Sequence, residues 1–133
     1  MFMTDLCYLL LRLVAGVSLF GHGLVRLPKL AGFSQWMTGT FAKSMLPQSL
    51  VMPFSYMLPI AEFIIGLLLI LGLFSNKAIL AGVIVMLLLI FGTCMIENWE
   101  ALPSQIIHAL VLIMLLQFIA SNNISLDKFL SKY

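Results

Sequence analysis

Four stretches of this 133-residue sequence are long and apolar enough to cross a lipid bilayer. A transmembrane helix needs roughly 20 mostly apolar residues, and such runs lie at about 6–27, 53–74, 78–96 and 102–120. Charged residues make up only 9% of the chain, whereas a soluble domain carries about 25%. The sequence therefore predicts an all-α membrane protein whose solvent is the lipid bilayer. We expect a bundle of four transmembrane helices, forming a single membrane domain over residues 1–133.

The segment at about 30–45, between the first and second apolar stretches, follows a different pattern. Its larger apolar side chains recur at spacings that suit one helical face; they are Leu30, Phe33, Trp36, Met37, Phe41 and Met45. Trp and Phe favour the interface between lipid and water. We expect a short amphipathic helix lying on the membrane surface, with an ordered loop as the alternative. The apolar residues of 126–130 suggest another short surface helix near the C-terminus.

The basic residues bear weakly on orientation. An even number of spans puts both termini on one side of the membrane. That side holds Lys77, Lys128 and Lys132, with Arg12 nearest to it, and the other side holds Arg26, Lys29 and Lys43. This small excess favours cytoplasmic termini in a multi-pass protein of the inner (cytoplasmic) membrane. Arg12 is expected to extend its charge to the interface, and a net charge of +2 is too small to indicate nucleic acid.

Three ionisable side chains fall at similar depth in the half of the bundle away from the termini. At about 1.5 Å per residue, His22 and His108 lie roughly 8–9 Å from that end, and Glu62 lies about 13 Å from it. Arg26 is one turn beyond His22, and Gln105 is three residues before His108, so each pair shares a helical face. A charge at a bilayer centre costs about 2.5–3.5 kcal/mol. These five residues are therefore candidates for a small-molecule pocket. Glu62, His22 and His108 are the candidate catalytic site, for proton transfer or ligand binding.

Small residues in the first two spans predict close helix contacts. Gly66 is one turn from Glu62, and Gly16 and Gly23 are a heptad apart on the first helix. Small side chains let membrane helices approach each other closely. We expect Glu62 to face the bundle interior on the same side as Gly66. No set of metal ligands is predicted.

Four pieces of the sequence, in this order and spacing, carry a resemblance to a known family. They are Arg12-Leu13 through Gly16 to Phe20 with His22-Gly23 and Arg26; Gly32-Phe33 and Trp36; Pro59, Ala61-Glu62, Gly66 and Gly72-Leu73-Phe74; and Ser125-Leu126-Asp127. On these residues the chain resembles the DoxX-like family of small bacterial membrane proteins. His108 stands where the family often has an acidic residue, which weakens the case for acid-pair chemistry. Ser121-Asn122-Asn123 replaces a frequent Gly-Pro-Gly turn.

The resemblance implies a four-helix membrane protein linked to sulfur or quinone redox chemistry. With this implication, the candidate small-molecule pocket is also a candidate quinone pocket, formed by His22, Arg26, Glu62, Gln105 and His108. Some relatives look like the membrane subunit of a thiosulfate:quinone oxidoreductase. We predict a membrane subunit of a quinone-linked or sulfur-related redox system, an oxidoreductase subunit that needs a soluble or membrane redox partner; its oligomeric state is left open. The alternative is a non-catalytic scaffold, assembly or interaction protein whose polar cluster only holds the helices together. A small-molecule or proton pathway, and haem ligation by His22 and His108, are weaker alternatives.

Overall fold

The computed structural model describes residues 2–133, and the regular structure in that range is helical. The elements are α1 (Phe2–Arg26), η1 (Leu27–Lys29), α2 (Leu30–Thr40), α3 (Gln48–Leu71), α4 (Ser75–Met95), α5 (Leu102–Gln117), η2 (Ile119–Ser121) and α6 (Leu126–Leu130). The predicted all-α class is confirmed. Within the described range, three helical stretches are long and apolar enough to cross a membrane: Met3–Thr40, Gln48–Leu71 and Ser75–Met95. α5 is shorter, at 16 residues.

α3 begins earlier than the apolar run indicated, at Gln48 rather than near Pro53. The first turn of the helix is partly polar, so a search for apolar length does not count it. Gln48 also donates a hydrogen bond from Nε2 to the carbonyl oxygen of Thr38 (3.0 Å), which ties the start of α3 to the end of α2. The first turn of α3 is therefore stabilised by a contact with α2, which an apolar run in the sequence does not show.

Helix ends follow local backbone chemistry. α3 ends at Leu71 because Gly72 takes a left-handed conformation with φ 69°, which glycine adopts without steric cost. The N–H of Leu73 then donates to the carbonyl oxygen of Leu68 (3.0 Å). α5 ends at Gln117, earlier than the predicted end near residue 120, and the chain continues through the 3-10 turn η2.

Glycines bring α1 and α3 into backbone contact. A Cβ atom added at Gly23 would lie 2.5 Å from the backbone nitrogen of Phe63, and one added at Gly66 would fall on the backbone of Phe20. Gly16 lies on the same contact. Such close approach strengthens van der Waals packing between membrane helices, where no hydrophobic effect drives association. The close contacts predicted at these glycines are present in the structure.

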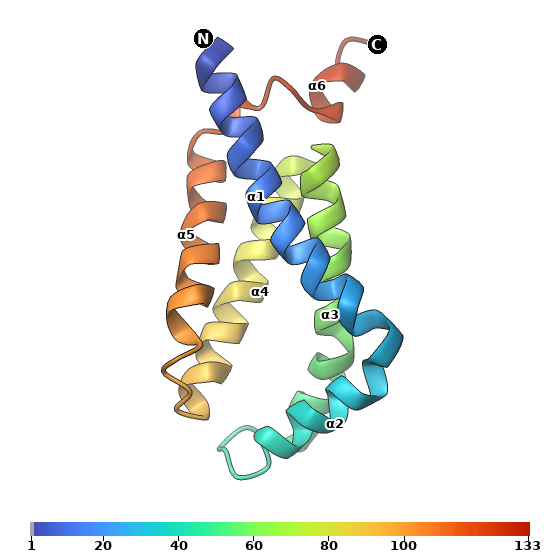
Figure 1. The fold of residues 1–133 in the computed structure, drawn as a ribbon, viewed down its shortest axis with the longest axis vertical. Helices are drawn as coiled ribbons and strands as arrows, with labels where there is room; N and C mark the ends of the chain where they lie inside the picture. Colours follow the sequence, from blue (N-terminus) through green and yellow to red (C-terminus); the bar gives the residue numbers. More distant parts are fainter. Residues whose placement is uncertain (1) are drawn as a thin grey trace.

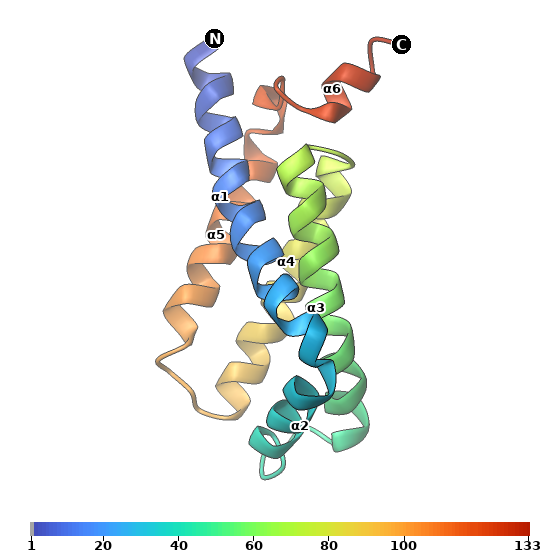
Figure 2. The same ribbon diagram turned by 45° about the vertical axis from the view of Figure 1, so that its right-hand side comes forward.

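The helices form two pairs that meet at the end carrying the termini and diverge at the other end (Figures 1 and 2). α1 packs mainly against α3, and α4 mainly against α5. The common core includes Leu19, Leu69, Ile79, Leu112 and Leu115. At the diverging end, α2 packs on α3 through a second apolar cluster of Met37, Phe41, Val51 and Leu58. This divergence leaves room for the pocket described below.

The outward faces of the long helices are apolar. Val14 on α1, Ile64 on α3, Leu87 on α4 and Ile107 on α5 are each about half exposed or more, at 64%, 49%, 59% and 59%. Large apolar side chains exposed on every side of a molecule are unfavourable in water, whereas lipid tails solvate them. The chain is therefore a membrane protein, as its composition predicted.

Arg12 does not extend to the interface, so the sequence-based expectation for this residue is wrong. Its side chain is 2% exposed. The guanidinium donates hydrogen bonds to the side-chain oxygen of Asn122 and to the carbonyl oxygen of Ile124 (3.0 Å). Gly72 leaves space for it, since a Cβ there would lie 2.8 Å from the Arg12 guanidinium. Arg12 thus fixes the segment after η2 against the bundle.

Asp127 attaches the C-terminal segment to the start of α4. Its two carboxylate oxygens accept hydrogen bonds from the backbone N–H groups of Phe74 (2.7 Å) and Ser75 (2.8 Å). A carboxylate at this position satisfies helix N–H groups that have no partner within the helix. Burial alone would raise the pKa of Asp127, but the hydrogen bonds from Ser75 and Phe74 and the charge of Arg12 outweigh it. The pKa therefore lies below its ordinary value of 3.8.

Asp127→Asn should destabilise the protein by about 0.5–2 kcal/mol near neutral pH, as loss of a helix cap does. A folded-state pKa below the unfolded one means that the carboxylate stabilises the fold fully above about pH 4. This contribution is lost as the pH falls through the folded-state pKa. Thermal unfolding in detergent at neutral and acid pH checks both points. The variant should lose less stability than the wild type on acidification, and an equal loss in both proteins would contradict the assignment.

Candidate ligand-binding pocket

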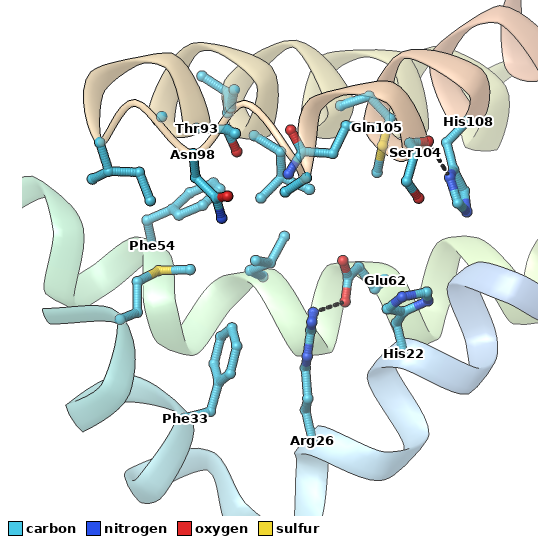
Figure 3. Close-up of a pocket in the computed structure, with 18 of the residues that line it drawn as sticks. His22, Arg26, Phe33, Phe54, Glu62, Thr93, Asn98, Ser104, Gln105 and His108 are labelled. Atoms are coloured by element: carbon cyan, nitrogen blue, oxygen red, sulfur yellow. Dashed lines mark hydrogen bonds and ion pairs between the residues drawn. The ribbon is translucent and has the colours of Figure 1, made fainter. Parts of the chain in front are cut away.

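A cavity of about 290 Å³ lies between the two helix pairs at the end where they diverge. The five residues selected from the sequence, His22, Arg26, Glu62, Gln105 and His108, all contribute to its lining. Figure 3 shows that they come from α1, α3 and α5 and face a common space. The structure thus places all five residues selected from the sequence around one cavity.

Glu62 and Arg26 form an ion pair across α1 and α3. Arg26 Nη1 donates to Glu62 Oε2 at 2.9 Å, and the Glu62 side chain is 4% exposed while that of Arg26 is 28% exposed. The guanidinium also stacks over the Phe33 ring, with Cζ 4.7 Å from the ring centroid. A cation on an aromatic face gains electrostatic energy. The pair balances charge within the pocket, as a carboxylate so deep in the bundle requires.

The two histidines lie beside each other, with ring centroids 6.1 Å apart and ring planes at 86°. Nδ1 of His22 is 2.6 Å from the carbonyl oxygen of Ser18, and Nδ1 of His108 is 2.8 Å from that of Ser104. A carbonyl oxygen only accepts hydrogen bonds, so each Nδ1 carries a hydrogen. In the neutral imidazole, Nε2 is then the acceptor nitrogen, available to a hydroxyl or to a ligand.

Ser18 contacts both histidines, and the sequence analysis did not select it. Its carbonyl oxygen accepts from His22 one turn later, and its hydroxyl lies 2.6 Å from His108 Nε2 on α5. Because that nitrogen is an acceptor in the neutral ring, the hydroxyl donates. The available signal was the spacing, since Ser18 is four residues before His22 in a mostly apolar helix.

Gln105 faces Glu62 from the opposite side of the cavity (Figure 3). Its side-chain oxygen Oε1 is buried and has no hydrogen-bond partner among residues 2–133. A buried amide oxygen without a partner costs about 1–3 kcal/mol. A residue kept at such a cost is a candidate for contact with a ligand or a bound water.

Aromatic side chains of α2, of the residue after it and of α3 line one wall of the cavity. Phe33, Trp36, Phe41 and Phe54 lie on this side, and the loop between α4 and α5 contributes Asn98. Trp36 is 60% exposed. The cavity therefore combines a flat apolar wall with a polar inner end.

Ser18→Ala should weaken the link between α1 and α5 by about 0.5–1.5 kcal/mol, the usual net value of one hydrogen bond. It should also change the proton environment of His108, because the ring loses its Nε2 partner. Nitrogen NMR of the imidazole, together with thermal unfolding, measures both effects. Ser18→Thr keeps a hydroxyl and serves as the control. An unchanged His108 spectrum in Ser18→Ala would show that this hydrogen bond is not formed.

Among residues 2–133, no cluster of three or more His, Cys, Asp or Glu side chains is arranged to hold a metal ion. The pocket nevertheless offers one cation, one carboxylate and two imidazoles. These groups can donate, accept and store protons in a space with apolar walls.

A family model described as DoxX matches residues 7–94, well over half of the chain. The matched segment contains His22, Arg26 and Glu62, whereas Gln105 and His108 lie beyond it. No curated protein and no solved structure matches the chain. With the family match, the all-helical fold and the lipid-facing apolar surfaces together, the chain belongs to the DoxX family of membrane proteins.

Proposed function

We propose that the chain is the membrane subunit of a quinone-linked or sulfur-related redox system, and that its pocket binds the head group of a quinone. In this proposal α1, α3, α4 and α5 all cross the inner membrane as one domain, and α2 lies at the interface. α5 is about 24 Å long at 1.5 Å per residue. It is shorter than the roughly 30 Å of hydrocarbon, and η2 extends it.

The observation that carries the proposal is the combination of an aromatic wall with a polar inner end in one membrane-embedded cavity. Small-molecule sites are mostly apolar, with a few polar groups that orient the ligand. At about 290 Å³, the cavity lies at the small end of the range for such sites, so it suits a single ring. A longer isoprenoid tail would leave between the diverging helix pairs.

The residues of the polar end suit proton transfer to a ring oxygen. His22 Nε2 lies at the end of the ring opposite the hydrogen bond to Ser18, so it can exchange a proton with a ligand. Glu62 stabilises positive charge on that ring, and Arg26 is paired with Glu62 through the 2.9 Å ion pair. Quinone reduction needs two electrons, supplied by a redox partner subunit, and two protons. His22 and Glu62 would relay these protons from water to the ring oxygens one after the other.

The scaffold alternative rests on the same contacts. The Arg26–Glu62 pair joins α1 to α3, and the Ser18–His108 hydrogen bond joins α1 to α5. Both would hold helices together without any ligand. Haem ligation is disfavoured, because the Ser18 hydroxyl occupies His108 Nε2.

Mass spectrometry of everything that co-purifies with the protein separates the two functions. The redox proposal predicts a bound quinone and a redox partner subunit. A stable protein partner with no bound small molecule would favour the scaffold instead.

Both termini face the cytoplasm in this proposal, together with the turn between α3 and α4. A reporter that is active only outside the cytoplasm should be silent when fused at Lys77 and active when fused at Trp99. The opposite pattern would reverse the orientation.

A further inference from the structure

The formal net charge of +2 lies entirely at the end of the molecule that carries the termini. Figure 1 shows that the first residues of α1 and of α4 lie at this end, together with α6. Its charged side chains are Arg12, Lys77, Lys128 and Lys132 against Asp5 and Asp127. The other end has as many acidic as basic residues: Arg26, Lys29 and Lys43 against Glu62, Glu97 and Glu100.

Both acids at the terminal end are used inside the protein. Asp127 accepts hydrogen bonds from the backbone at the start of α4, and Asp5 accepts one from Asn123 Nδ2 (2.9 Å). Arg12 is buried. The three lysines are exposed, and no ion pair among the described residues involves a lysine. Their charge is therefore directed outward without a partner.

The fold brings together the two backbone segments that carry Lys77 and Lys128. Asp127 binds the N–H of Ser75, two residues before Lys77, and Lys128 follows Asp127 directly. Between α6 and the start of α4 lies a polar hollow of about 290 Å³, whose lining includes Asn76, Lys128 and Ser131. The Asp127 carboxylate also lines the hollow, but both of its oxygens accept hydrogen bonds from backbone N–H groups at the start of α4. The ammonium group of Lys128 and the polar side chains beside it therefore suit an anionic oxygen group.

Apolar side chains surround the lysines. Phe129 and Leu130 on α6 are 57% and 56% exposed, and the Phe129 ring lies 5.5 Å from that of Tyr133. Lys77 Nζ lies 5.9 Å from the centroid of the exposed Phe74 ring. Basic groups next to exposed aromatic and aliphatic side chains are typical of segments that lie in the headgroup region of a membrane.

We propose that this end of the protein binds the headgroups of anionic phospholipids, with Lys77 and Lys128 contacting the phosphate beside the hollow. Each basic residue near an anionic membrane surface strengthens binding by about 1 kcal/mol, or about fivefold. The buried Arg12 and the Asp127 cap hold the segment that carries Lys128. The site lies at the opposite end of the molecule from the quinone pocket and does not depend on that assignment.

The test uses the purified full-length chain titrated with phosphatidylglycerol or phosphatidylcholine in mixed micelles. Binding is followed by native mass spectrometry and by the rise in melting temperature. We expect the wild type to prefer phosphatidylglycerol, and the preference to shrink at higher salt. Lys77→Gln with Lys128→Gln should weaken phosphatidylglycerol binding about tenfold or more. Lys77→Arg with Lys128→Arg should restore it.

Lys29→Gln with Lys43→Gln is the matched control, because it removes the same charge from exposed positions at the other end. This variant should keep the preference of the wild type. Equal losses in the two double glutamine variants would mean that only net charge matters, and would overturn the proposal. So would equal binding of the two lipids by the wild type.

Discussion

Gly23→Ala and Gly66→Ala should each lower the melting temperature of the protein in detergent, whereas Gly21→Ala should raise it. A Cβ at Gly23 would stand 2.5 Å from the backbone of Phe63, and one at Gly66 would overlap the backbone of Phe20. Backbone atoms cannot rotate away, so α1 and α3 must separate. Overpacking of this kind costs about 1–3 kcal/mol, and larger side chains such as Leu should cost more.

Gly21 is the matched control, since it lies on α1 with Gly23 and a Cβ there meets no atom within 4 Å. Alanine is favoured over glycine inside a helix by about 0.5–1 kcal/mol, so Gly21→Ala isolates the propensity effect. Thermal unfolding of the three variants measures whether each substitution raises or lowers the melting temperature. A rise in melting temperature for Gly23→Ala would contradict the close backbone contact between α1 and α3 at this glycine.

Glu62→Gln should strongly slow the proton-coupled function and leave the fold nearly intact. Glutamine has nearly the same shape, and its oxygen can still accept from Arg26, but it has neither charge nor titratable proton. General acid–base groups contribute about 10²–10⁴-fold, so the rate of quinone reduction, measured with the redox partner present, should fall at least about a hundredfold. The free energy of unfolding should change by less than about 1 kcal/mol.

Glu62→Leu provides the comparison. It leaves Arg26 without its acceptor, so stability should fall by about 1–3 kcal/mol, between the values for exposed and buried pairs. Arg26 is partly exposed, at 28%, which keeps the loss below that of a fully buried pair. If Glu62→Gln keeps the full rate while Glu62→Leu only loses stability, then the carboxylate has a structural role and the scaffold function is favoured.

The sequence predicted the elements whose cause is local. Long apolar runs identified the main helices, and the glycine spacing identified the α1–α3 contact. The start of α3 was missed because its first turn is polar and is tied to α2 through Gln48 and Thr38. The length of α5 was overestimated because an apolar run does not show where a helix changes to a 3-10 turn.

The pocket could be anticipated because depth along a helix follows directly from residue number. His22, Glu62 and His108 were selected on that basis, and all three line one cavity. Side chains whose partners are distant in the sequence could not be assigned. Arg12 binds Asn122, which is 110 positions away. Ser18 gains its significance from His108, which is 90 positions away on another helix.

Fluorescence of Trp36 gives the most direct test of the quinone site, because this side chain lines the cavity and a quinone bound there should quench it. Wild-type protein titrated with a short-chain quinone should show saturable quenching, measured in a Trp99→Phe background so that Trp36 alone reports. His22→Phe, which keeps a ring but removes the acceptor nitrogen, should weaken binding about tenfold, the effect of one lost hydrogen bond. Quenching that rises linearly without saturation, or identical affinities for the two proteins, would contradict the site.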